Sequence, residues 1–294
     1  MRRAIGQSLR IGVACHAVSL ARVSRWRGEP FTVLAEHAIA PSAEHPFDAI
    51  ANALRALLGE QDVGGWPVGV VLADELTRMW RVTPPPGATR LDDMEAAAGL
   101  RFQALYGEAP PAWRIAADWN ATEPFFAAAV PRALLAVLEL MAREFKLSVV
   151  GVEPHFVSAW NRWRRGMKQG AWFGLLHDNL LTLAAIDAAG KGAGAQSMRA
   201  IRALPVPPGA DAAWLARTLQ REALLLDMPP PALLQLCGGA SAGAAGVAGA
   251  AGAHVWTRAA GPSQIPCEAL EHGRHAAGAG LSMAALLARG GSVA

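Results

Sequence analysis

The sequence predicts an α/β protein, and three features of the chain support this fold class. Residues 11–23 form an apolar, β-prone run that is typical of two strands joined by a short turn. Further along, segments with helical spacing alternate with short β-prone segments, as they do in α/β folds. A strand hairpin followed by a helix occurs in both halves of the chain, which indicates a weak internal duplication.

The first half opens with the elements of a sheet and one covering helix. A turn at 28–30 leads into a third β-rich run at 31–39. Over 47–58 the apolar residues recur three and four positions apart, which predicts an amphipathic helix that packs on a sheet. A strand at 68–72 then completes this group of elements.

The next stretch predicts a small inserted subdomain at about 76–119. Its predicted elements are a strand at 79–82, a helix at 91–106 and a strand at 112–119. Asp92 and Asp93 suit the start of that helix, because negative charge is stabilised near a helix N-terminus. A strand at 125–130 then resumes the main alternation.

The remaining elements continue the alternation in two predicted lobes, 1–160 and 161–294. They are a helix at about 131–145, a strand at 148–152, a helix at 155–167, a hairpin at 171–176 and 180–187, a strand at 198–204, a helix at 214–226, a strand at 233–236 and a final helix at 280–287 that packs back on the body. The Gly- and Ala-rich segment 238–252 is predicted to be a frayed helix, with a strand at 254–257 after it.

The composition limits the cellular compartments in which we expect the protein. Apolar residues make up 52% of the 294 residues and charged residues 17%, but no unbroken apolar run reaches the roughly 18 residues that a membrane helix needs. The basic N-terminus lacks the apolar core of a signal peptide, so we expect a cytoplasmic protein. Three widely spaced cysteines indicate a reducing compartment, and a net charge of +3 is too small to predict nucleic-acid binding.

Three local passages, in order, carry a family resemblance. Residues 143–154 match a helix end, a Lys-Leu pair, a strand and a closing Val-Glu-Pro; residues 236–240 contain a glycine pair; and residues 280–284 open a helix of small residues. The chain resembles PilM-type pilus assembly proteins over about 11–287, and the related cytoplasmic domains of type II secretion and mannose-sensitive agglutinin pilus biogenesis proteins. The resemblance implies an actin-like (ribonuclease H-like) two-lobed ATPase fold with a small inserted subdomain.

The chain departs from this family in both phosphate loops. The resemblance assigns an acidic residue and a glycine to the first turn, where this chain has Ala14 and His16, and it assigns a polar residue to Ser19 or Leu20. In the second loop Gly174 remains, but no acidic-x-Gly follows. Hydrolysis in this fold needs carboxylates that hold Mg²⁺ and orient a nucleophile. We therefore expect a pseudo-ATPase that binds no cofactor, or that retains ATP with Mg²⁺ weakly.

Five small residues are the candidate nucleotide contacts that remain: Gly12, Ser19, Gly238, Gly239 and Ala240. Paired glycines let a backbone approach adenosine closely, but they are equally typical of a tight turn that leads into a helix.

Two histidine-containing groups are not expected to form sites. His177 and Asp178 are adjacent on a predicted strand, so their side chains are expected on opposite faces. Cys267, His272 and His275 lack the spacing of a zinc module.

Two surfaces are candidates for partner binding. The run 160–168 concentrates basic and aromatic residues, with Trp160, Trp163, Arg164 and Arg165 as candidates for an acidic partner or anionic lipid. The alternative is a helix end whose arginines suit its negative pole.

The resemblance adds a docking surface beside the subdomain, near 79–85 and 91–105, with candidates Trp80, Val82 and Leu91. Trp66, Trp80 and Trp113 lie near turns or in the subdomain and are predicted to include exposed anchors.

The resemblance implies a cytoplasmic platform that binds a short cytoplasmic segment of an inner-membrane pilus or secretion protein, with peripheral membrane association through that partner and no nucleic acid. One alternative is an active ATPase or sugar-kinase-like enzyme, which would need a carboxylate near the phosphate loops, either Asp178 or Asp187. A second alternative is a DNA-associated or regulatory protein that uses the 160–168 run, whose binding would weaken steeply with salt.

Overall fold

The computed structural model describes residues 6–24, 31–40, 46–187, 197–239, 256, 265–270 and 281–289. The chain divides into two compact units: Met1–Ser158 together with Leu287–Ala294, and Ala159–Leu286. None of the described helices has both the length and the apolar character that crossing a membrane requires.

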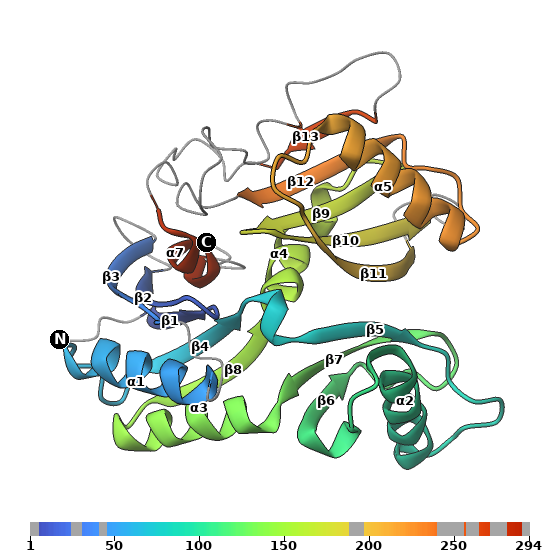
Figure 1. The fold of residues 1–294 in the computed structure, drawn as a ribbon. Coiled ribbons are helices and arrows are strands. Elements are labelled where there is room, and N and C mark those ends of the chain that lie inside the picture. The colour runs from blue at the N-terminus through green and yellow to red at the C-terminus, as the bar shows by residue number, and fades with distance from the viewer. Residues whose placement is uncertain are drawn as a thin grey trace. The chain divides into compact units, whose positions relative to one another are not determined.

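The first unit is built on a five-stranded sheet with the order β3-β2-β1-β4-β8 (Figure 1). Its strands are β1 (Gln7–Val13), β2 (Ala17–Ser24), β3 (Phe31–Ala38), β4 (Pro67–Leu72) and β8 (Ser148–Pro154). The first three strands pair antiparallel, whereas β4 and β8 run parallel to β1. The prediction of two strands joined by a short turn, followed by a third strand, is confirmed. Only three residues separate β1 from β2, and a short turn joins neighbouring antiparallel strands.

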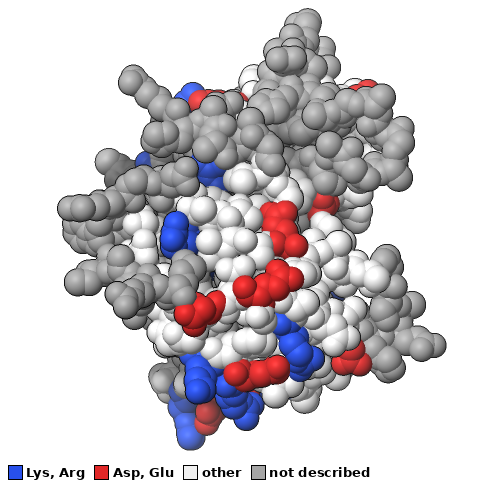
Figure 2. Space-filling view, turned by 90° about the vertical axis from the view of Figure 1, so that its left-hand side faces the viewer, with Lys and Arg blue, Asp and Glu red and all other residues white. Residues whose placement is uncertain are grey.

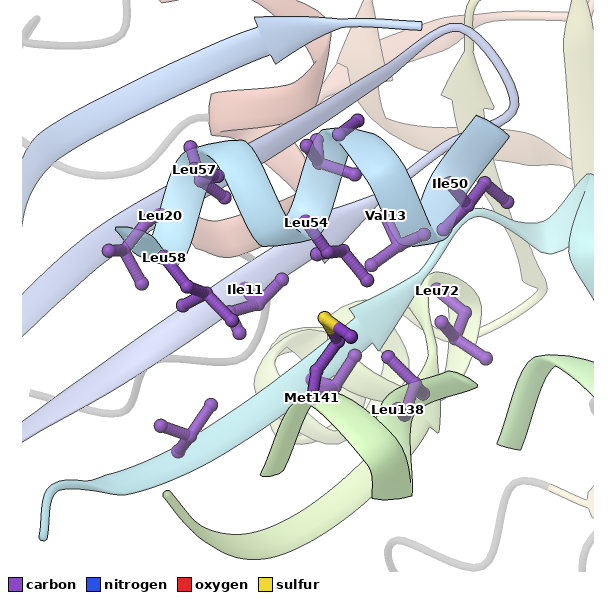
Figure 3. Close-up of a cluster of buried hydrophobic side chains, with 14 of the residues drawn as sticks. Ile11, Val13, Leu20, Ile50, Leu54, Leu57, Leu58, Leu72, Leu138 and Met141 are labelled. Atoms are coloured by element: carbon purple, nitrogen blue, oxygen red, sulfur yellow. The ribbon is translucent and has the colours of Figure 1, made fainter. Parts of the chain in front are cut away.

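Two helices cover one face of this sheet and enclose the main core. Helix α1 (Pro46–Gly59) and helix α3 (Arg132–Glu144) pack against each other along the sheet (Figure 1). Figure 3 shows Leu54 of α1 and Met141 of α3 converging on Ile11 of β1, and all three side chains are buried. Residues spaced by two along β1 share this face. Each fully buried leucine of this size contributes roughly 1.5–3 kcal/mol to folding.

The inserted subdomain contains a second sheet, with the order β5-β7-β6, and helix α2. Its elements are β5 (Arg78–Val82), α2 (Leu91–Tyr106), β6 (Trp113–Ala117) and β7 (Phe125–Pro131), with short 3₁₀ turns at Asp74–Leu76 and Pro110–Ala112. The assignment of 125–130 to the main alternation is wrong, because β7 pairs antiparallel with both β5 and β6. The segment that carries this sheet therefore extends beyond residue 119.

Aromatic side chains form the core of this small sheet. The ring centroids of Trp80 and Phe102 are 5.2 Å apart, and those of Phe102 and Trp113 are 5.4 Å apart. The Tyr106 hydroxyl donates to the carbonyl oxygen of Met79 at 2.9 Å. A core with few members needs large side chains, and this explains the burial of Trp80 and Trp113. Trp66 is also buried, so the prediction that these three tryptophans include exposed anchors is wrong.

The second unit repeats the topology of the first sheet, with the strand order β11-β10-β9-β12-β13 (Figure 1). Its strands are β9 (Ala171–His177), β10 (Leu180–Asp187), β11 (Ser197–Pro205), β12 (Leu233–Gly239) and β13 (Cys267–Ala269). Three strands again pair antiparallel, and two run parallel to the first of them. The predicted duplication is therefore confirmed at the level of topology.

Helix α5 (Ala212–Leu225) begins at a capping aspartate and is tied to the sheet by a buried carboxylate. The Asp211 carboxylate accepts from the Trp214 backbone N–H at 2.7 Å, which satisfies one of the free amides at the helix start. Glu222 is buried, with its carboxylate 3.6 Å from Arg202 of β11 and 2.8 Å from Arg221. This helix stands within one or two residues of its predicted position.

The remaining helices are α4 (His155–Trp163), which a 3₁₀ turn at Arg164–Gly166 extends, and α7 (Met283–Arg289). The Gly- and Ala-rich part of 238–252 lies outside the described residues from residue 240 onward. Of the strand predicted at 254–257, only Trp256 is described, and its conformation is helical.

Candidate functional site

The first candidate site is the turn at 14–16, where β1 ends beside the end of β4. The backbone N–H of Ala14 donates to Ala17 at 2.9 Å, and that of Ala73 donates to Val13 at 2.8 Å. The side chains of Ala14 and Ala73 are fully buried and pack with Leu287 of α7. The position that the resemblance assigns to an acidic residue is therefore filled by an apolar contact.

Two carboxylates that the sequence reasoning missed lie beside this turn. Asp74 is buried, and its carboxylate accepts from the backbone N–H of Phe156, the second residue of α4, at 2.9 Å. A carboxylate is favoured there by the free amides and the positive pole of the helix. Glu75 accepts from the backbone N–H of Cys15 at 3.0 Å. The signal was available, since an Asp-Glu pair follows the predicted strand at 68–72 almost directly.

The pKa of the Cys15 thiol indicates whether this turn favours negative charge. The residue as a whole is exposed, but its thiol lies against Glu75. Desolvation raises the pKa of Cys15 to about 12, with further contributions from the charge of Glu75 and from its hydrogen bond. The turn therefore disfavours negative charge, whereas a phosphate-binding turn must favour it.

The residues at the first turn do not fit a Mg²⁺-bound triphosphate. The turn itself offers no carboxylate, and Asp74 and Glu75 are both bonded to backbone amides. A triphosphate next to Glu75 would be repelled by its charge. Within the part of the chain that the structure describes, no three His, Cys, Asp or Glu side chains converge as a metal site.

The candidates Gly12 and Ser19 lie inside the β1–β2 hairpin. They are register partners in the two strands, and Ser19 is fully buried. Leu20, the alternative to Ser19, is also buried in β2. The prediction that Ser19 or Leu20 belongs to the turn is therefore wrong, because the turn ends at His16 and β2 begins at Ala17.

In the second unit, the structure supplies a packing reason for Gly238. Its φ is +89°, and a Cβ built on it would lie 2.0 Å from the carbonyl oxygen of Leu176 on the paired strand β9. Only glycine avoids both the clash and the strain of this conformation. Gly239 is the last residue of β12 and pairs with His177, while Ala240 lies outside the described residues. Gly238 thus serves the approach of β12 to β9, and contact of the glycine pair with a nucleotide stays a prediction.

The expectation that His177 and Asp178 point to opposite faces is wrong. Asp178 follows β9 in the turn, with a φ of +51°, so strand alternation ends at His177. The Nδ1 atom of His177 lies 3.6 Å from a carboxylate oxygen of Asp178. Asp187 stands at the other end of β10, where it pairs with Ser197. Of the two carboxylates that an active enzyme could use, only Asp178 is at the turn.

Two residues of the predicted docking surface are buried. Trp80 and Val82 are each 1% exposed in the subdomain core, so a partner cannot reach their side chains. They are buried because they lie on the face of β5 that α2 covers. Leu91 remains 49% exposed at the start of α2.

The run 160–168 exposes two adjacent arginines. Trp160 is half-buried against Phe173, with ring centroids 5.6 Å apart, and the Arg162 guanidinium lies 5.4 Å from the ring centroid of Trp163. Arg164 and Arg165 are exposed. On the face that Figure 2 shows, the visible basic residues lie among acidic ones and form no continuous basic field. Nucleic-acid binding requires such a field.

Comparison with known proteins identifies the fold. No family model matches the chain, and neither does any curated protein. Similar solved structures include a PilM–PilN type IV pilus biogenesis complex, at 16% identity over 92% of this chain and 89% of that one, with a TM-score of 0.57. The cytoplasmic domain of EpsL, an inner membrane component of the type II secretion system of Vibrio cholerae, is 14% identical over 78% of this chain and 81% of that one, with a TM-score of 0.51.

A third similar structure is a Bacteroides thetaiotaomicron protein with an actin-like ATPase fold. It is 10% identical over 81% of this chain and 84% of that one, with a TM-score of 0.55. At these identities the similarity establishes architecture. The chain therefore has the actin-like fold that its resemblance to the PilM-type proteins predicted.

Proposed function

We propose that this protein is a non-catalytic platform for the assembly of a type IV pilus or a related secretion system. In this proposal it stands in the cytoplasm at the inner membrane and binds a short cytoplasmic segment of a membrane partner. The observation that carries the proposal is Ala14, which is buried against Ala73 and Leu287 where the fold's ATPases place an acidic residue. The similar structures, from a type IV pilus complex and a type II secretion system, support the choice of process.

The chemistry of the first turn supports a role in binding rather than in turnover. Phosphoryl transfer depends on metal ions that neutralise developing charge, and carboxylates hold those ions. Asp74 and Glu75 are instead hydrogen-bonded to the backbone of α4 and to the turn. A turn of this chemistry favours a binding role over phosphoryl transfer.

The docking surface that we propose lies at the two ends of α2. Leu91 and Leu105 are 49% and 40% exposed there. Both leucines lie on the side of the helix that also carries the buried Ala98 and Phe102, since 14 positions are nearly four turns. A partner segment would therefore contact each leucine at an end of α2, beside the covered part of this side.

The first experiment tests turnover. Calorimetry with Mg-ATP and a hydrolysis assay on the same sample are expected to show no hydrolysis, with binding absent or weak. Tight binding without hydrolysis would make the protein a nucleotide-gated adaptor. Measurable turnover would contradict the proposal and would instead favour an active ATPase or sugar-kinase-like enzyme that uses Asp178. An Asp178→Asn variant would then be expected to lose that turnover.

The second experiment tests the partner and the surface together. Fluorescent peptides that correspond to the cytoplasmic segments of inner-membrane proteins encoded beside this chain are titrated with the protein, and anisotropy is measured. Leu91→Asp is expected to weaken binding about tenfold, since a charge replaces a contacting apolar group. Leu140→Asp on α3 is the matched control, because Leu140 has nearly the same exposure, 48%. Equal effects of the two variants would reject the α2 surface.

A further inference from the structure

Two helices, one in each unit, expose a large leucine on the side opposite to their buried residues. Leu100 of α2 is 70% exposed, and Leu224 of α5 is 81% exposed. Leu100 lies about 200° around the helix from the buried Ala98 and Phe102, and Leu224 lies about 180° from the buried Leu215. Neither leucine contributes to the core of its own unit. Single exposed apolar side chains are common on protein surfaces, so the charges beside the two leucines carry the argument that follows.

The two faces carry opposite charge. On α2, Asp92, Asp93 and Glu95 are exposed before Leu100, and one basic residue, Arg101, is exposed after it. On α5, Arg217 and Arg221 are exposed before Leu224, and Arg221 pairs with the buried Glu222 at 2.8 Å. Within the described ranges neither Asp93 nor Arg217 has an ion-pair partner, and Asp92 has only a contact of 3.8 Å with the exposed Arg90.

The spacing of charge and leucine is the same on both helices. Asp93 precedes Leu100 by seven residues, and Arg217 precedes Leu224 by seven residues. Seven residues rise about 10.5 Å, nearly two turns, so each pair lies along one stripe of its helix. If the two helices pack side by side in the same direction, Leu100 meets Leu224 and Asp93 meets Arg217. Packing in opposite directions would instead set each leucine against a charge.

We propose that the occupant of these faces is a second copy of this chain, with α2 of one molecule packed on α5 of the next. The acidic face and the basic face are complementary, and the chain supplies both. Because the two faces differ, one contact leaves an α2 face and an α5 face uncovered, so the copies either close as a reciprocal dimer or a ring, or continue as an open array. One pair of helices forms a small interface, so we expect the association to depend on protein concentration and to weaken with salt.

The test is sedimentation velocity of the full chain at low salt over a range of concentrations. The unaltered protein is expected to form dimers or larger species as concentration rises. Asp93→Arg and Arg217→Glu are each expected to raise the dissociation constant about tenfold or more, because attraction becomes repulsion. Glu123→Arg and Arg199→Glu are the matched controls, since both residues are exposed and lie outside the two helices. These controls are expected to associate like the unaltered protein.

Mixing the two single variants tests whether the α2–α5 contact, and no other contact, drives the association. In an equimolar mixture of Asp93→Arg and Arg217→Glu, each contact between α2 of one variant and α5 of the other sets opposite charges against each other, so the mixture is expected to assemble although neither variant does so alone. A chain that carries both substitutions restores opposite charges and is expected to assemble again. Circular dichroism confirms that each variant is folded.

Three outcomes would overturn the proposal. They are an unaltered protein that stays monomeric at every concentration, single variants that assemble as well as the controls, and a mixture that assembles no better than either variant alone. A monomeric protein that binds vesicles of anionic lipid, and loses that binding in Arg217→Glu, would assign the α5 face to a membrane instead.

Discussion

The two five-stranded sheets share one topology but end their first strand in different ways. In the first unit β1 leads into the turn 14–16, where Ala14 is buried under Leu287. In the second unit β9 leads into a turn that begins with Asp178, a carboxylate close to the imidazole of His177. The strand order is thus the same in both units, whereas the first turn is part of a packed core and the second carries polar side chains.

The largest loss in the free energy of unfolding is expected when an acidic residue is placed in the first turn. Ala14→Asp would bury a carboxylate among apolar neighbours and beside Glu75, so we expect a loss of about 3–5 kcal/mol in the free energy of unfolding. Urea denaturation measures this loss. Asp178→Ala is the matched change in the second turn and is expected to cost within about 1 kcal/mol. A stable Ala14→Asp protein that binds Mg-ATP would mean that the turn can still hold phosphate.

The second effect tests whether Gly238 serves packing. Gly238→Ala places a methyl group against the Leu176 carbonyl at a positive φ, and we expect it to cost about 2–4 kcal/mol. Gly209→Ala is the control, because Gly209 also has a positive φ, +74°, but a Cβ there meets no atom within 4 Å. It is expected to cost about 1 kcal/mol from backbone strain alone. Equal losses would remove the close approach of β12 to β9 as the reason for the glycine.

Most elements of the fold could be predicted from periodicity, since each helix stripe and strand run carries its own local signal. The sheet to which a strand belongs carries no such signal, and for this reason β7 was placed in the wrong layer. The site was harder to predict because it depends on which side chains are buried. Nothing local indicates that Trp80 packs inward while Leu91 stays exposed, or that Asp178 leaves the strand pattern one residue after His177.

A smaller effect is expected at Asp74, which links the first turn to α4. Asp74→Asn keeps the shape of the side chain but removes the charge that accepts from Phe156, and we expect a loss of about 1–2 kcal/mol. Thermal or urea unfolding measures it. Asp211→Asn is the comparison in the second unit, because Asp211 caps α5 in the same manner but is exposed. Its cost is expected to be smaller, since an exposed helix start can bond water. A larger cost at Asp211 than at Asp74 would show that burial is not what makes the first cap important.

The smallest expected effect is on the reactivity of Cys15, and the free energy of unfolding is expected to change little. Desolvation first, and then Glu75, raise the pKa of Cys15 to about 12, so at pH 8 nearly all of this residue is the unreactive thiol. Glu75→Gln removes the negative charge, the pKa of Cys15 falls, and the thiolate fraction at pH 8 rises. We expect Cys15 to react with iodoacetamide about three to ten times faster, as followed by peptide mass spectrometry. Cys267 is an internal control, because burial alone raises its pKa to about 11 and Glu75 has no part in it. If Cys15 reacted at the same rate in both proteins, desolvation alone would account for its inertness. Desolvation of the thiol would then account for the raised pKa of Cys15, and the Glu75 charge would add nothing to the difference between the two turns.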